Sequence, residues 1–153
     1  MKIDKIYKLI FGEIIKPKAF QRKFDLDDNY VFITPNSYYG FVLCKKEIPF
    51  NLEMITYAKS KIDLFSMIKP ENQLRKTKNF VMVEGQGLIN ILKNNDKKTY
   101  INSKFLSYFE DYAEFYQEKE NSLVAVVENG QLIGAICPIR YDEEWEKWPI
   151  EKE

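Results

Sequence analysis

The strongest constraint on the fold is a repeated pattern of two short apolar segments separated by a tight turn. The clearest case joins residues 123–128 to 131–137 through Asn129 and Gly130. A two-residue type I′ turn requires a positive φ at both central positions, which an Asn-Gly pair tolerates. Other patterns of this kind lie at 30–34 with 38–44, at 80–84 with 88–92, and at a turn over 94–97 that leads into 98–101. These patterns predict β-hairpins, so antiparallel pairing dominates the predicted fold.

Two segments have the spacing of an amphipathic helix. Near the N-terminus, Ile3, Ile6, Tyr7, Ile10 and Phe11 fall at i, i+3, i+4, i+7 and i+8, which predicts a helix that Gly12 ends. Asn102 or Ser103 is expected to cap a second helix that runs to about Gln117, because Phe105, Phe109, Tyr112 and Tyr116 share one face. Residues 20–26 suggest a short strand, 54–68 are ambiguous between helix and strand, and the polar segment 70–78 is predicted to be a loop.

The order of these elements predicts an α+β fold with antiparallel sheets and two helices. Helix then hairpin at 3–44 is echoed by helix then hairpin at 103–137, which suggests two pseudo-symmetric halves. A chain of 153 residues suits one domain. We expect that domain to span 1–140, followed by an acidic tail at 141–153 that contains Trp145 and Trp148.

Composition removes several kinds of catalytic site. The sequence has no histidine, which excludes Ser-His-Asp and Cys-His nucleophiles and histidine-ligated zinc or iron. Its two cysteines, Cys44 and Cys137, are too few for a four-cysteine zinc site, and both fall in predicted strands, where a free thiol acts as a small buried apolar group. We therefore expect no metal and no cofactor, and the composition favours a binding protein over an enzyme.

The sequence also indicates a compartment. Residues 1–14 alternate charged and apolar side chains and lack the continuous apolar core of a secretory signal. No apolar run approaches the roughly 18 to 20 residues of a membrane span. We therefore expect a cytoplasmic protein with no membrane partner, and oligomerisation is left open.

The formal net charge is zero, but the charges are unevenly distributed. Residues 1–24 contain seven basic and two acidic side chains and residues 59–98 contain nine and four, whereas 102–120 and 142–153 are net acidic. Separated signs can create a basic face on a neutral protein. The candidate DNA-binding residues are Lys2, Lys5, Lys8, Lys16, Lys18, Arg22, Lys23, Arg75, Lys76 and Lys78. Scattered, solvated charges are the alternative.

Several motifs resemble one family. Residues 99–109 (TYINSKFLSYF), the strand at 124–127, the Asn-Gly turn and residues 134–140 (GAICPIR) resemble the closing portion of a domain of the bacterial DNA polymerase sliding clamp. The strand at 31–43 is similar to another strand of that family, with Thr34-Pro35-Asn36 where Thr-Asp-Gly would stand and Tyr38 where an Arg would stand. The resemblance implies a single clamp-like domain with two helix-plus-sheet halves, and DNA or a replication protein as the partner.

Two features suggest protein contacts. Residues 61–65 (KIDLF) are similar to the short peptide by which partners dock onto a sliding clamp, with Lys61 in place of Gln, so Leu64 and Phe65 are candidate partner-binding residues. Burial in the core is the alternative for both. Trp145 and Trp148 are candidates because tryptophan commonly anchors interfaces, although the tail could equally pack back on the domain.

Three functions follow from the sequence. The first is a non-enzymatic binding module for DNA or a replication protein. The second is a protein-interaction or inhibitor module that uses Leu64, Phe65 or the tail tryptophans. The third is an enzyme built on the carboxylates of the predicted second helix, namely Glu110, Asp111, Glu114 and Glu118, which are more simply explained as solvated charges on its outer face.

Overall fold

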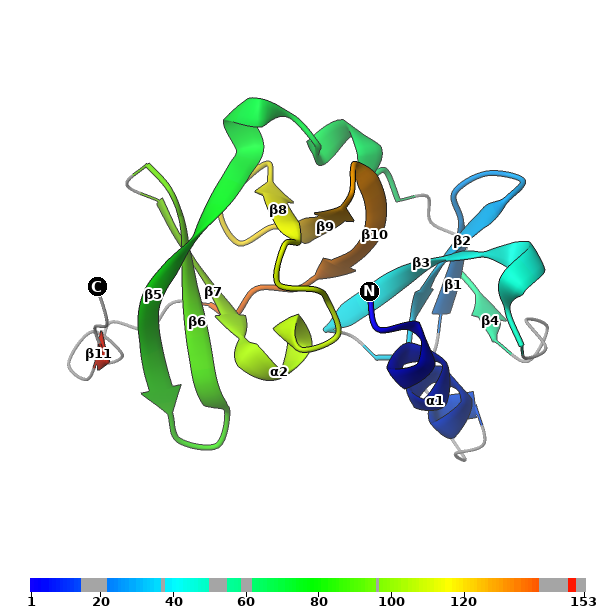
Figure 1. Cartoon of the computed structure of the whole chain (residues 1–153), viewed down its shortest axis with the longest axis horizontal. Helices are drawn as coiled ribbons and strands as arrows, with labels where there is room; N and C mark the ends of the chain where they lie inside the picture. The colour runs from blue at the N-terminus through cyan, green and yellow to red at the C-terminus, as the bar shows by residue number, and fades with distance from the viewer. Residues whose placement is uncertain are drawn as a thin grey trace.

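Helix α1 (Ile3–Ile14) lies against a long, curved sheet (Figure 1). The computed structural model describes residues 1–14, 22–36, 38–49, 55–58, 62–95, 97–140 and 149–150. Its strands are β1 (Arg22–Asp25), β2 (Tyr30–Thr34), β3 (Tyr39–Cys44), β4 (Thr56–Tyr57), β5 (Gln73–Val83), β6 (Gly87–Asn94), β7 (Lys97–Asn102), β8 (Glu114–Gln117), β9 (Val124–Glu128), β10 (Gln131–Ile136) and β11 (Pro149–Ile150). Helix α2 (Ser103–Leu106) and the 3-10 helices η1 (Lys45–Glu47), η3 (Phe65–Met67) and η4 (Pro70–Asn72) complete the described elements.

The strands pair in the order β4-β1-β2-β3-β10-β9-β8-β5-β6-β7. Among the described strands, β1 and β4 are parallel and the other pairs are antiparallel. Strand β5 joins two parts of the sheet, because its first residues pair with β8 while β6 follows its other edge. The predicted α+β class with antiparallel pairing is confirmed.

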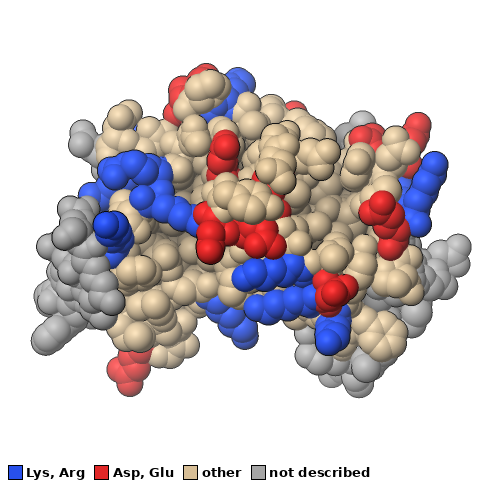
Figure 2. Space-filling model, in the orientation of Figure 1, with Lys and Arg blue, Asp and Glu red and all other residues tan. Residues whose placement is uncertain are grey.

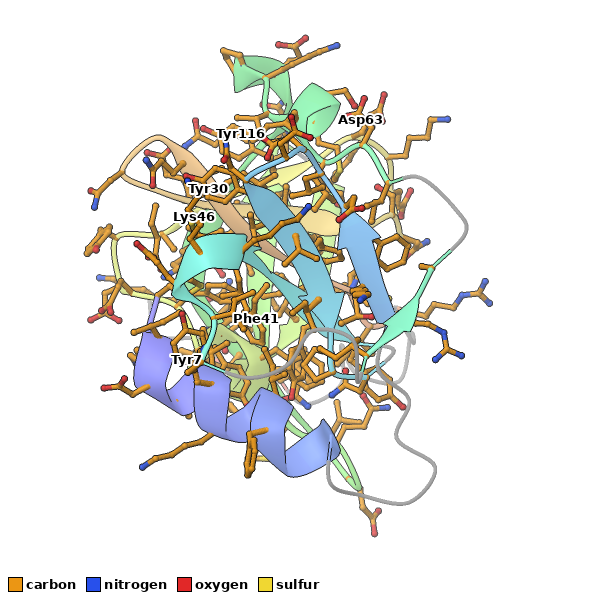
Figure 3. The ribbon with its side chains drawn as sticks, turned by 90° about the vertical axis from the view of Figure 1, so that its right-hand side faces the viewer. Tyr7, Tyr30, Phe41, Lys46, Asp63 and Tyr116 are labelled. Carbon is orange, nitrogen blue, oxygen red and sulfur yellow. The ribbon has the colours of Figure 1, made fainter. Side chains whose placement is uncertain are left out.

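Both faces of the central strands are covered. On one face, Ile6 and Ile10 of α1 pack into a core with residues such as Phe41 of β3. Figure 3 shows Phe41 just above α1, on the side of the helix that faces the sheet. On the opposite face, Leu64 and Met67 pack with a second core that includes residues of β2, β3, β9 and β10.

The predicted hairpins are confirmed. Strands β2 and β3, β5 and β6, β6 and β7, and β9 and β10 each pair antiparallel. In the last of these, Asn129 has a φ of 50° and Gly130 a φ of 76°, as the two central residues of a type I′ turn require. The turn chemistry therefore fixed this hairpin locally.

The predicted helix from 103 to about 117 is wrong. Asn102 does cap a helix, with its side-chain oxygen accepting from the Lys104 amide, but α2 contains only four residues. Residues 114–117 form β8 instead, in which Phe115 faces the α1 core and Tyr116 the opposite core. Because both faces of β8 are buried, its apolar residues do not alternate with polar ones, and the aromatic spacing imitates a helix.

Two further expectations need correction. The segment 70–78 is not a loop, since β5 begins at Gln73 and is held by pairing with β6 and β8. Leu74 alone is buried among residues 73–78, so this part of the strand is mostly polar and has the composition of a loop. Helix α1 continues past Gly12 to Ile14, because Gly12 does not adopt the positive φ that would end it. The ambiguous segment 54–68 contributes β4 and η3 where it is described.

Both ends of the chain are tied to the sheet. The N-terminal ammonium contacts the Glu128 carboxylate, which is 7% exposed and also accepts from the Glu110 amide at 2.8 Å. Near the other end, Pro149 and Ile150 pair with Val81 and Phe80 of β5. Part of the predicted tail therefore packs on the domain, and residues 141–148 and 151–153 lie outside the described residues.

Candidate functional site

Three basic side chains form one row across neighbouring strands. Arg75 of β5 pairs with Lys93 of β6, and Lys93 pairs with Lys98 of β7. Directly paired residues of antiparallel strands point to the same face, so the three cations are neighbours on one surface. We call Arg75, Lys93 and Lys98 the basic row. Arg75 and Lys98 are exposed and Lys93 is half-buried.

The basic row has no internal counter-charge among the described residues. In the part of the chain that the structure describes, ion pairs join the N-terminal ammonium to Glu110 and Glu128, and Lys45 to Asp25. None of these pairs includes a residue of the basic row. Like charges directly opposite each other destabilise a sheet. The row therefore presents uncompensated positive charge, which a bound polyanion would neutralise.

Two of the predicted DNA-binding lysines are instead held by local contacts. The Lys76 ammonium donates to the Asp111 backbone oxygen at 3.2 Å and lies 5.2 Å from the centre of the Phe115 ring. The Lys5 ammonium donates to Ser107 Oγ at 3.0 Å and lies 4.8 Å from the centre of the Tyr108 ring. Lys76 thus links β5, and Lys5 links α1, to the segment between α2 and β8.

The remaining predicted cations do not gather in one place. Lys2, just before α1, and Lys8, within it, are exposed. Arg22 and Lys23 are half-buried in β1. Lys16 and Lys18 lie outside the described residues. On the face drawn in Figure 2, blue atoms over β5 and β6 are separated by red atoms from the blue group nearer α1. Of the predicted set, Arg75 is the member placed in the basic row.

The predicted partner-binding residues also separate. Leu64 is fully buried, so its alternative assignment to the core is the one that holds. Phe65, in η3, is 54% exposed and lines a hollow of about 310 Å³ together with Tyr30 and Leu132. Trp145 and Trp148 lie outside the described residues.

A larger cleft, of about 720 Å³, opens between the β5–β6 turn, α2 and the start of β3. Tyr38 lies at its rim, 56% exposed, and stacks on Phe105 with ring centres 5.8 Å apart and planes 19° apart. Phe105 in turn lies 4.9 Å from Tyr39, centre to centre. The cleft thus has an aromatic wall whose outermost ring is open to solvent.

Backbone hydrogen bonds hold this wall in place. The Tyr38 amide donates to Asn36 Oδ1 at 2.8 Å, and its carbonyl oxygen accepts from the Cys137 amide at 2.6 Å. Asn102 connects the other two sides, because its Oδ1 accepts from the Lys104 amide and its Nδ2 donates to the Gln86 carbonyl at 2.9 Å. These bonds tie the start of β3 to the residue after β10, and the β5–β6 turn to the start of α2.

The side chains free to meet a ligand are of three kinds. Lys104 is exposed and forms no ion pair within the described part of the chain. Gln86 is exposed in the β5–β6 turn. Burial raises the pKa of the Cys137 thiol, so this group remains protonated near neutral pH and is a poor nucleophile. The lining suits binding rather than covalent chemistry.

The carboxylates of the predicted enzyme do not converge. Glu110 lies 3.7 Å from the N-terminal ammonium, whereas Glu114 accepts from the Tyr116 hydroxyl at 2.7 Å. Asp111 and Glu118 are exposed in separate segments. Across the residues that the structure describes, no three metal-ligating side chains are grouped to hold an ion.

Sequence reasoning missed the residues that complete both surfaces. Lys93 and Lys98 could have been found, because the turn predicted at 94–97 places them opposite each other once the register is written out. Tyr38 and Phe105 could not, because they lie 67 positions apart and meet only through the pairing of β3 with β10 and the position of α2.

Comparisons with protein families, with curated proteins and with solved structures found no match to this chain. In the described residues, no helix is long and apolar enough to cross a membrane.

Proposed function

We propose that the protein is a non-enzymatic nucleic-acid-binding module that contacts phosphates through the basic row. The observation that carries the proposal is the alignment of Arg75, Lys93 and Lys98 across three paired strands. Repulsion among these three cations destabilises the sheet, and a bound polyanion offsets this repulsion. Like the DNA-binding prediction from sequence, it takes DNA as the partner. The predicted residues are divided between the N-terminal segment and residues 75–78, and the proposal keeps Arg75 and adds Lys93 and Lys98 as the contact surface.

The test is the salt dependence of DNA binding. Each lysine or arginine that neutralises a phosphate contributes about 0.9 to the slope of log K against log salt on duplex DNA and about 0.7 on single strands. Replacing Arg75 and Lys98 with Gln removes two exposed cations of the row. We expect the slope to fall by about 1.8 on duplex DNA or about 1.4 on single strands, measured by fluorescence anisotropy.

A matched control removes the same charge elsewhere. Lys46, on η1, and Lys119, between β8 and β9, are exposed and lie in elements outside β5–β7. Figure 3 shows Lys46 on the side of the molecule formed by β1–β3. The Lys46→Gln/Lys119→Gln variant should keep the wild-type slope. Equal effects of the two double variants would refute the basic row as the contact surface, and a wild type that binds no DNA would refute the function.

The second candidate is a protein-interaction module at the hollow beside η3. It is supported by the exposure of Phe65 and of Tyr30, which is 40% exposed, around one small depression whose lining is both apolar and polar. Exposed aromatic rings are typical anchors of interfaces. A protein partner of this surface should be lost with Phe65→Ser and kept with Arg75→Gln/Lys98→Gln, whereas the opposite result would assign that partner to the basic row.

The clamp-like organisation is proposed more narrowly, as a likeness of the N-terminal half. It is supported by α1, which packs Ile6 and Ile10 against the β2–β3 hairpin as one helix-on-sheet half would. The second half would rest on the four-residue α2 and the β9–β10 hairpin. An experimental structure in which residues 3–44 fail to superpose on one helix-on-sheet half of a sliding-clamp domain would end this proposal.

A further inference from the structure

The cleft bounded by Tyr38, Phe105, Lys104 and Gln86 is the second surface with the chemistry of a ligand site. Its volume of about 720 Å³ falls within the range of small-molecule pockets. Hydrogen bonds to Asn36 Oδ1 and from the Cys137 amide fix the Tyr38 backbone, and the exposed Tyr38 ring stacks on Phe105, so it offers a flat surface in a defined position. The other walls carry the Lys104 ammonium, which attracts an anion, and the Gln86 amide, which both donates and accepts hydrogen bonds.

We propose that this cleft receives an unpaired nucleotide, with its base stacked on Tyr38 and its phosphate near Lys104. A nucleotide combines the two chemistries that the cleft presents, an aromatic plane and an anionic group. Stacking of bases on aromatic side chains is how proteins commonly hold single strands, and it tolerates any base sequence. The inference rests on the proposed function for its source of nucleotides and makes single-stranded nucleic acid the preferred partner.

The cleft and the basic row are connected through β7. Lys98 belongs to the row and Asn102 lines the cleft, and the even spacing places both on the same face of the strand. Four residues of β-strand span about 13 Å. Tyr100, between them, is buried against Ile139. An oligonucleotide of about eight residues is within the usual site size for a small domain and would reach both surfaces.

The stacking geometry also selects against duplex DNA. A base inside a duplex has both faces covered by its neighbours, so it cannot lie on Tyr38 without being flipped out of the stack. The phosphates of a duplex can still reach the basic row. Replacement of Tyr38 should therefore weaken single-strand binding selectively, whereas replacement of the row weakens both.

The experiment measures binding of three probes to the full chain: an oligothymidylate of about eight nucleotides, a blunt-ended two-stranded DNA duplex, and thymidine monophosphate. Tyr38→Ala should weaken oligothymidylate binding about tenfold and leave duplex binding unchanged. Tyr38→Phe, which keeps the ring, should retain wild-type affinity. The control is Tyr112→Ala, because Tyr112 is similarly exposed at 58% and does not line the cleft.

Each outcome decides between the two proposals. If Tyr38→Ala binds oligothymidylate as the wild type does while Arg75→Gln/Lys98→Gln loses affinity, the cleft inference is wrong and the basic row stands. If the wild type binds thymidine monophosphate in a Tyr38-dependent manner but no oligonucleotide, the cleft takes free nucleotides and the proposed function fails. If it binds none of the three probes, both proposals are refuted. Near-UV circular dichroism of each variant checks that the fold is retained.

Discussion

The contact between β3 and β10 allows a sharp test of how tightly the sheet is assembled. An ideal Cβ added at Gly134 would lie 2.6 Å from the Gly40 backbone oxygen and 3.0 Å from two ring carbons of Phe109. The nearest atom belongs to the backbone of a hydrogen-bonded neighbour, because Gly134 pairs with Phe41 and Ala135 with Gly40. Gly134→Ala therefore requires the two strands to separate, not a side chain to rotate.

The magnitude follows from two opposing effects. Forcing extra volume into a close-packed site costs about 1–3 kcal/mol, and the upper end applies because backbone must move. Replacing Gly with Ala recovers about 0.4–1 kcal/mol by restricting the unfolded chain. The expected loss for Gly134→Ala is about 2 kcal/mol. For a chain of this length that corresponds to a melting temperature lower by about 4–8 °C.

Gly12→Ala is the matched control. Gly12 lies inside α1, and among the described residues no atom other than those of the adjacent helix backbone lies within 4 Å of an added Cβ. Alanine is favoured over glycine in a helix by about 0.5–1 kcal/mol, so this variant should be more stable than the wild type. The free energy of unfolding of each variant is measured by urea titration. The comparison requires that the slope of this free energy against urea concentration is the same in the variants and the wild type. Wild-type stability for Gly134→Ala, or stability changes of the same sign in both variants, would refute the close approach of β3 and β10.

Two further perturbations test buried polar contacts. Glu128→Ala removes the carboxylate that the N-terminal ammonium contacts and leaves the Glu110 amide without its acceptor, so the free energy of unfolding should fall by about 3 kcal/mol, whereas Glu128→Gln keeps an acceptor and should lose less. Equal losses in urea titrations would show that the hydrogen bond contributes nothing. The hydrogen bond to Glu114, followed by burial, raises the pKa of Tyr116 above its usual value of 10.0. The protonated Tyr116 hydroxyl stabilises the folded state, and this stabilisation is fully present below that value and is lost as the pH rises through the raised pKa. The stability of Tyr116→Phe should therefore change less than that of the wild type between about pH 9 and about pH 11. An unchanged pH dependence of the urea midpoint would count against this assignment.

The hairpins were predictable because their signals are local. At Asn129-Gly130 the two residue types that tolerate positive φ occur together, between segments rich in Val and Ile. The turn fixes which residues face each other for several positions on either side. The same local logic predicts the register of Lys93 opposite Lys98, and so two thirds of the basic row, although the residues were not selected as a site.

The failures share a physical cause. Around residues 114–117 the apolar pattern is consistent with either secondary structure, because β8 is buried on both faces and its side chains need not alternate. At 73–78 the reverse holds, since a strand with mostly exposed side chains has the composition of a loop. Pairing with strands distant in the sequence decides both cases, and those pairings leave no local trace.

The sequence by itself determined the antiparallel α+β class, the positions of the main turns and the amphipathic character of α1, because each depends on residues within a few positions of one another. It also excluded histidine chemistry by composition. Only the tertiary structure decided which cations stand together and which aromatic rings form a wall. Arg75 joins Lys93 through strand register, and Tyr38 meets Phe105 through strand pairing and the position of α2. Contacts across such separations depend on how the whole sheet closes, which no local pattern records.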